Sequence, residues 1–152
     1  MTPEQHFRAL EVMYAKARIN EYFQPALQVD DGRATVTLPV RRDFYHAAHA
    51  VHGAVYFKAL DDAAFFAANS AVLDFFVLTV TFNVMLLRPV TEGTLVAEGT
   101  LLDRSRNLLV AAAELRDDRG KIVARGSGTF AISKIPLGPE VGYYGELRGL
   151  EG

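Results

Sequence analysis

The sequence predicts an α+β domain in which one curved antiparallel sheet of about six strands wraps around a long central helix. A mostly apolar stretch over residues 53–71 is too long for a strand, and it is apolar on almost every side, which is typical of a buried helix. Before it, Asp31-Gly32 separates two segments, over residues 26–30 and 33–40, as in a β-hairpin. Four further extended segments follow the helix, so enough strands are available to cover it.

These four later segments are expected to form an antiparallel meander. Turn signals such as Arg88-Pro89 and the polar run Arg104-Ser105-Arg106 separate them. The expected strands cover residues 76–87, 93–103, 107–117 and 121–133.

The chain begins with an amphipathic helix, expected over residues 3–20. Thr2 can cap it, with Pro3 at the first helical position and Gln5 completing a capping box. We expect this helix to pack against the domain without a chemical role. Residues 1–133 are then one domain, and residues 134–152 form a Gly- and Pro-rich tail that lies on the surface and is anchored by Tyr143 or Tyr144.

Composition narrows the classes of function. The chain has 152 residues, a net charge of −2 and no cysteine. The charge gives no long-range attraction to nucleic acid or to an anionic membrane, and the absence of cysteine excludes thiolate catalysis and disulfides. No basic and apolar leader and no membrane-length apolar run are present, so we expect a soluble, cytoplasmic protein with neither nucleic acid nor membrane as a partner.

Two neighbouring carboxylates on the central helix differ in their surroundings. Lys58, Asp62 and Asn69 fall on one narrow stripe, which is expected to be the only side of the helix in contact with water, with Lys58 and Asp62 paired. Asp61 instead shares its side of the helix with Phe57, Ala64, Phe65 and Ala68. Burial among apolar side chains raises the pKa of a carboxyl and favours its use as a base or nucleophile. The alternative is that Asp61 caps a backbone donor or pairs with an arginine.

The start of the same helix offers a second functional group. His52-Gly53 opens it, and the free N–H groups of a first helical turn suit a developing oxyanion. Eight residues separate Gly53 from Asp61, or ~12 Å along the axis, which is too far for both to reach one carbonyl. If both act, they come from different subunits of a two-fold dimer.

His46, His49 and His52 recur at intervals of three and raise the question of a metal site. The loop offers little beyond Asp43 to orient such ligands, so we expect no metal and no cofactor, with His46 and His49 lining a pocket mouth or bonding locally.

These residues together resemble a known family. His52-Gly53-Ala54, Asp61 nine residues after the histidine, and Asn69-Ser70 closing the helix are similar to hot-dog thioesterases of the PaaI-like, phenylacetate-degradation type. The run from Asn83 to Arg88-Pro89 and the segment from Arg106 to Phe130 add to the resemblance, which covers roughly residues 25–133.

The resemblance implies a hot-dog fold and hydrolysis of an acyl-CoA thioester between two subunits. It assigns Asp61 as general base or nucleophile, the Gly53 N–H with His52 beside it as the group that polarises the carbonyl, and Thr79 as the hydroxyl that helps to place water. Further substrate contacts are expected from His46, Ala54, Asn69, Ser70, Arg104 and Arg106, the two arginines toward the CoA phosphates. A homodimer is the minimum, and a homotetramer built as a dimer of dimers is common in the family.

The loop departs from the family pattern in ways that keep other functions open. Ala54 replaces a usual glycine, His46 replaces a frequent asparagine, and His49 stands at a place that is usually glycine. A catalytically weak protein that binds acyl-CoA or CoA is therefore the second hypothesis. A hot-dog hydratase ranks third, because those enzymes commonly carry Pro-Gly after the histidine and this loop contains no proline.

Overall fold

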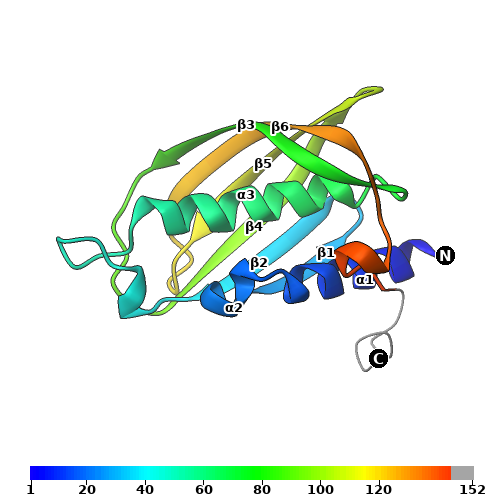
Figure 1. The fold of residues 1–152 in the computed structure, drawn as a ribbon. Helices are drawn as coiled ribbons and strands as arrows, with labels where there is room; N and C mark the ends of the chain where they lie inside the picture. The colour runs from blue at the N-terminus through cyan, green and yellow to red at the C-terminus, as the bar shows by residue number, and fades with distance from the viewer. Residues whose placement is uncertain (145–152) are drawn as a thin grey trace.

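The computed structural model describes residues 1–144 and contains one antiparallel sheet that curves around a central helix, α3 (Figure 1). The strand order across the sheet is β1-β2-β4-β5-β6-β3. The strands are β1 (Ala26–Asp30), β2 (Arg33–Pro39), β3 (Phe75–Leu86), β4 (Thr94–Arg104), β5 (Leu108–Arg116) and β6 (Ile122–Pro136). The predicted α+β class and the six-stranded sheet around one helix are confirmed.

Helix α3 (Gly53–Asn69) lies across the concave face of the sheet, chiefly against β4, β2 and β5. The close approach to β4 depends on Gly99, since a Cβ at that position would lie 2.1 Å from the carbonyl oxygen of Ala63. Ala63 and Ala64 are fully buried at this crossing. Small residues on both sides thus set the depth at which the helix sits, and with it the position of Asp61.

The predicted meander of four strands is wrong in its pairing. Strands β4, β5 and β6 do form a meander, but β3 pairs with β6 at the edge of the sheet, and β4 pairs with β2. The burial pattern explains this arrangement. Strand β4 buries Leu95, Ala97 and Gly99 under α3, as a central strand does, whereas most side chains of β3 are partly or fully exposed.

The N-terminal helix is shorter than expected. Helix α1 (Pro3–Lys16) starts with the predicted capping box of Thr2 and Gln5, then ends where Ala17 adopts an extended conformation. A separate short helix, α2 (Ile19–Phe23), follows. Together α1 and α2 run alongside β1 and α3 (Figure 1), and a second apolar cluster joins Leu10 and Met13 to Phe66 of α3.

The C-terminal segment continues the sheet before it leaves. Strand β6 extends to Pro136 rather than 133, and a short 3-10 turn (Pro139–Val141) follows. Tyr143 is buried and its hydroxyl lies 2.7 Å from Nδ1 of the buried His6, so Tyr143 anchors this segment to α1. The rest of the predicted tail, residues 145–152, lies outside the described residues. Over the described part of the chain, no helix is both long and apolar enough to span a membrane.

Candidate functional site

Asp61 lies half-buried in the wall of an open pocket of ≈ 300 Å³ between α3, the N-terminal helices and β3. Its Oδ1 accepts a hydrogen bond of 3.0 Å from Oγ1 of Thr79 on β3. Burial raises the pKa of Asp61 to about 6, against the lowering effect of the Thr79 bond, while the neighbouring Asp62 charge raises it further and Lys58 lowers it. Thr79, which the resemblance assigned to the placement of water, thus bonds Asp61 within one chain. A carboxylate with this pKa is largely ionised at neutral pH and remains a competent base.

The neighbouring Asp62 has a structural explanation. Its Oδ2 accepts hydrogen bonds of 2.6 Å from the Lys58 ammonium and 2.6 Å from the Tyr14 hydroxyl. The side chains of Lys58 and Asp62 are only 12% and 16% exposed. The predicted Lys58–Asp62 pair is confirmed.

The prediction that Lys58, Asp62 and Asn69 form the one wet side of α3 is wrong. Helices α1 and α2 cover this stripe, with Lys58 stacked over the rings of Tyr14 and Phe23. The side of the helix that carries Phe57 and Asp61 is the more open one, with Phe57 41% exposed. Lys58, Asp62 and Asn69 each form hydrogen bonds with other groups of the protein, as buried polar side chains usually do.

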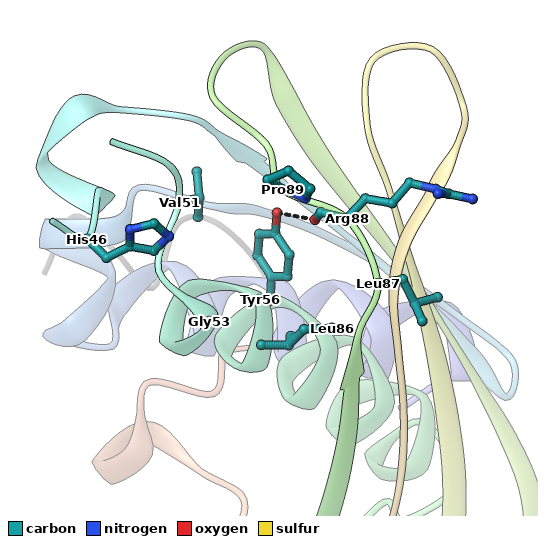
Figure 2. Close-up of a pocket in the computed structure, with 8 residues that line it drawn as sticks. All are labelled: His46, Val51, Gly53, Tyr56, Leu86, Leu87, Arg88 and Pro89. Carbon is teal, nitrogen blue, oxygen red and sulfur yellow. Dashed lines mark hydrogen bonds between the residues drawn. The ribbon is translucent and has the colours of Figure 1, made fainter. Parts of the chain in front are cut away.

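The N-terminus of α3 borders a second pocket of ≈ 310 Å³. Figure 2 shows Gly53 and Tyr56 of α3 facing the chain that leaves β3, with the Tyr56 hydroxyl donating to the Arg88 carbonyl at 2.8 Å. His46 lies at the opposite rim of this pocket (Figure 2), in line with its predicted place at a pocket mouth.

His52 caps α3 directly. Its ring Nδ1 accepts a hydrogen bond of 2.9 Å from the Ala54 N–H, so this donor of the first turn already has an acceptor. Within the described residues, the Gly53 N–H has no protein acceptor. Gly53 thus offers the free N–H at the positive end of the helix dipole, where an oxyanion is stabilised.

The loop histidines do not converge. His46 uses its Nδ1 to accept the Ala48 N–H, and the rings of His46 and His52 are 6.4 Å apart. His49 adopts a left-handed backbone conformation with φ 65°. Among residues 1–144, no three His, Cys, Asp or Glu side chains gather as metal ligands would.

Asn69 and Ser70, expected as substrate contacts, are buried and fully engaged within the chain. The Asn69 amide bonds the backbone of Val72, Phe75 and Val77, which fixes the start of β3. Ser70 donates to the Ala67 carbonyl at 2.6 Å and accepts the Gly32 N–H at 2.9 Å. Both residues hold the C-terminal end of α3 in place.

The two arginines predicted to meet CoA phosphates lie at that same end of α3, away from Gly53. Arg104 donates to the carbonyl of Ala71, and Arg106 is exposed in the turn between β4 and β5. Arg88, which the sequence did not single out for this role, borders the Gly53 pocket and is exposed, with its guanidinium directed away from His46 (Figure 2).

The N-terminal helices contribute to the site although no role was predicted for them. Met13, Tyr14, Ala17, Ile19 and Asn20 line the Asp61 pocket. Their amphipathic pattern indicated only that one face is buried, because periodicity does not say what that face is buried against.

Comparison with known proteins places the chain among related sequences and structures. A sequence model of the thioesterase superfamily matches residues 48–124, which include Gly53, Asp61 and Thr79. A candidate esterase of Saccharolobus solfataricus is 25% identical over 136 residues, covering 88% of this chain and 97% of that protein.

Solved structures share the fold over most of their length. The E. coli PaaI protein from the phenylacetic acid degradation operon has a TM-score of 0.81 at 20% identity, covering 90% of this chain and 99% of that one. A conserved protein of Pseudomonas aeruginosa has a TM-score of 0.74 at 26% identity, covering 86% and 98%. A thioesterase of Haemophilus influenzae has a TM-score of 0.75 at 18% identity, covering 84% and 90%. The expected hot-dog fold is confirmed by these likenesses.

Proposed function

The chain belongs to the thioesterase superfamily, and from this we propose that it hydrolyses acyl-CoA thioesters at a site shared between two subunits. The observation that carries the proposal is Asp61. It is a carboxylate with a raised pKa in a pocket wall, held by the Thr79 hydroxyl. It lies on the helix whose N-terminus presents the Gly53 N–H, which has no acceptor in residues 1–144.

In the proposed reaction the thioester C–S bond breaks and a C–O bond forms. As a general base, Asp61 takes a proton from water while the water oxygen attacks the carbonyl carbon. As a nucleophile, the Asp61 carboxylate attacks the carbon itself, and water then hydrolyses the resulting anhydride. In both routes the carbonyl oxygen gains negative charge, which the Gly53 N–H of a second subunit stabilises, and the CoA thiolate leaves.

A second subunit is needed because one chain keeps the two groups apart. Gly53 and Asp61 border different pockets and are separated by eight residues of helix, ~12 Å along its axis. A two-fold axis beside α3 would bring each Gly53 toward the Asp61 of the other chain.

Strand β3 is the edge through which we propose that the two subunits associate. It pairs with β6 on one side, and within the described chain its other edge is free. Val80, Met85 and Leu86 are 57%, 64% and 55% exposed on this strand. A long free edge with exposed apolar side chains invites another strand. Two copies joined here would form one continuous sheet, and two such dimers would form the homotetramer.

The Gly53 N–H can be tested by comparing two substitutions at the same position. Proline suits the first position of a helix and follows the extended His52 without strain, but it has no N–H. We expect kcat for Gly53→Pro to fall about 100-fold below that of Gly53→Ala, the usual effect of losing one oxyanion donor. Both variants place a Cβ 2.7 Å from the flexible end of Leu86, so Gly53→Ala controls for crowding. Equal rates for the two variants would remove the N–H from the mechanism.

A mixture of the Gly53→Pro and Asp61→Asn variants tests whether the site is shared between two subunits. Dimers of Gly53→Pro alone or of Asp61→Asn alone should retain only about 1% of the activity or less. A mixed dimer contains one intact site if the two groups come from different chains. Random exchange at equal concentrations should restore about a quarter of the wild-type activity. No recovery, with exchange verified by mass spectrometry, would place both groups in one chain.

Thr79 should set the pH dependence of the reaction. The bond from Thr79 lowers the pKa of Asp61, so Thr79→Val should raise that pKa. Since the ionised carboxylate is the active form, kcat/KM should fall below about pH 6 in the wild type, and in Thr79→Val this acid limb should move to higher pH.

At pH 7 we also expect about a tenfold loss of kcat/KM in Thr79→Val, through misplacement of the carboxylate and water. The matched control is Thr81→Val, because the Thr81 hydroxyl lies on the same strand but bonds Thr129. An unchanged acid limb in Thr79→Val would exclude this positioning role.

The second hypothesis, a protein that binds acyl-CoA without turnover, rests on His46 and Ala54, which depart from the family pattern beside Gly53. We propose that Arg88, Arg104 and Arg106 supply cations for the CoA phosphates in either case. Release of free CoA from a panel of acyl-CoAs decides between the two hypotheses. Binding of CoA without release from any thioester would favour the second.

A further inference from the structure

One side of the pocket beside Asp61 comes from a part of the chain that the family model does not match. This side consists of Met13 of α1, its C-cap Ala17, and Ile19 of α2. The rest of the apolar lining includes Phe65 of α3 and Phe76 and Leu78 of β3. The matched family segment begins at residue 48, so this side is built by the chain's own N-terminal segment. We infer that α1 and α2 form the wall of the acyl-binding pocket, and that it selects an uncharged apolar acyl group of medium length or an aryl group. This inference rests on the proposed thioesterase function.

The position of Asp61 dictates which part of a thioester enters the pocket. The carbonyl carbon must come within hydrogen-bond reach of the carboxylate or of one water bound to it, about 3 Å. One substituent of that carbon therefore extends over Phe65 and Phe76 toward Met13, and the other must leave toward solvent. Met13 is 5% exposed and marks the closed end, while Ile19 and Leu78, 56% and 45% exposed, mark the mouth.

Charge decides that the substituent inside is the acyl group rather than CoA. The described lining contains three charged residues, Lys58, Asp61 and Asp62, with a net charge of −1. The Lys58 ammonium is already bonded to Asp62 at 2.6 Å, so it is not free to bind a phosphate. A polyphosphate would be repelled here, and so would an acyl group that carries its own carboxylate.

Size sets the range of acyl groups. An apolar cavity of roughly 150 Å³ accommodates benzene in another protein. The present pocket, at ≈ 300 Å³, has room for an aryl ring or for a chain of several methylenes. An acetyl group would leave most of this apolar surface in contact with water, so longer acyl groups should react faster.

The test is a panel of acetyl-, butyryl-, succinyl-, octanoyl- and benzoyl-CoA with the wild type, Ala17→Phe and Ala15→Phe. In the wild type, kcat/KM for octanoyl- or benzoyl-CoA should exceed that for acetyl-CoA at least about tenfold. Butyryl- and succinyl-CoA have the same chain length, and the added carboxylate should lower kcat/KM about 100-fold.

Ala17→Phe places a ring at the pocket mouth, and it should reduce kcat/KM for octanoyl- and benzoyl-CoA at least about tenfold while butyryl-CoA changes less than about threefold. Ala15 is exposed on the same helix outside the pocket, so Ala15→Phe should leave the whole profile unchanged. Equal effects of Ala17→Phe on all thioesters, or a preference for succinyl- over butyryl-CoA, would overturn the inference while leaving hydrolysis intact. Release of CoA from none of them would overturn the proposed function as well.

Discussion

Replacing Asp61 with asparagine should reduce thioester hydrolysis about 1,000-fold while the protein remains folded. General acid–base catalysis by one positioned group contributes between about 100- and 10,000-fold, and a nucleophile that is lost contributes at least as much. The substitution keeps the shape of the side chain, and the amide oxygen can still accept the Thr79 hydroxyl now bonded to Oδ1 at 3.0 Å. The loss of rate should therefore report on chemistry, measured as CoA released at saturating acyl-CoA.

Stability should move in the opposite direction. Burial raises the pKa of Asp61 to about 6, above its value in the unfolded chain, so the folded state binds the proton more tightly. Stability from this group is then greatest at low pH and is lost as the pH rises through the pKa. At pH 7, Asp61→Asn removes an ionised group that the fold disfavours, and its urea midpoint should equal or exceed that of the wild type.

Asp62→Asn is the matched control for this experiment. It sits one residue away on α3 and borders the same pocket, but its carboxylate is already engaged by the Lys58 ammonium and the Tyr14 hydroxyl. Leaving the Lys58 ammonium without its partner should destabilise the fold by about 2 kcal/mol, while kcat at 25 °C stays within about tenfold of the wild type. Loss of activity in Asp62→Asn but not in Asp61→Asn would show that Asp62, and not Asp61, is the catalytic carboxylate.

The separation of these two carboxylates shows what a helical pattern can predict. Their angular positions on α3 and the pairing of Lys58 with Asp62 follow from a 100° turn per residue. The pattern could not predict that Tyr14 would cover that pair, because the partner comes from a helix about 50 residues earlier. A polar stripe that meets water and one that meets buried hydrogen-bonding partners have the same periodicity, and Asn69 illustrates the second case.

The strands were similarly predictable in extent but not in order. The alternation along β2 and the turn at Asp31-Gly32 place the first hairpin within one residue of its observed ends. Alternation identifies the buried face of a strand and says nothing about its neighbour, which is why the pairing of β3 with β6 was missed. The proximity of Thr79 to Asp61 was likewise invisible in the local pattern. The family resemblance pointed to Thr79 only as a hydroxyl that helps to place water.

Replacing Gly99 with alanine should cause the largest loss of stability among the substitutions considered. The added Cβ would lie 2.1 Å from the oxygen and 2.3 Å from the carbonyl carbon of Ala63, and 2.8 Å from the Ala64 nitrogen. These are backbone atoms of α3, so no side-chain rotation relieves the overlap and the helix must move away from β4. Overpacking of a buried site typically destabilises by about 1–3 kcal/mol, and a clash with rigid backbone belongs at or above the upper end of that range.

The matched control is Gly138→Ala. Gly138 has an extended backbone with φ −173°, and a Cβ there meets no atom within 4 Å. We expect a change of less than about 0.5 kcal/mol for this variant and a loss of about 3 kcal/mol for Gly99→Ala, from urea unfolding at one fixed protomer concentration. Because Ala63 lies two residues after Asp61, the folded fraction of Gly99→Ala should also have a lower kcat, as the displaced helix shifts the carboxylate relative to Thr79. Equal stabilities of the two variants would mean that α3 can lift from the sheet freely, and that its depth does not fix the position of Asp61.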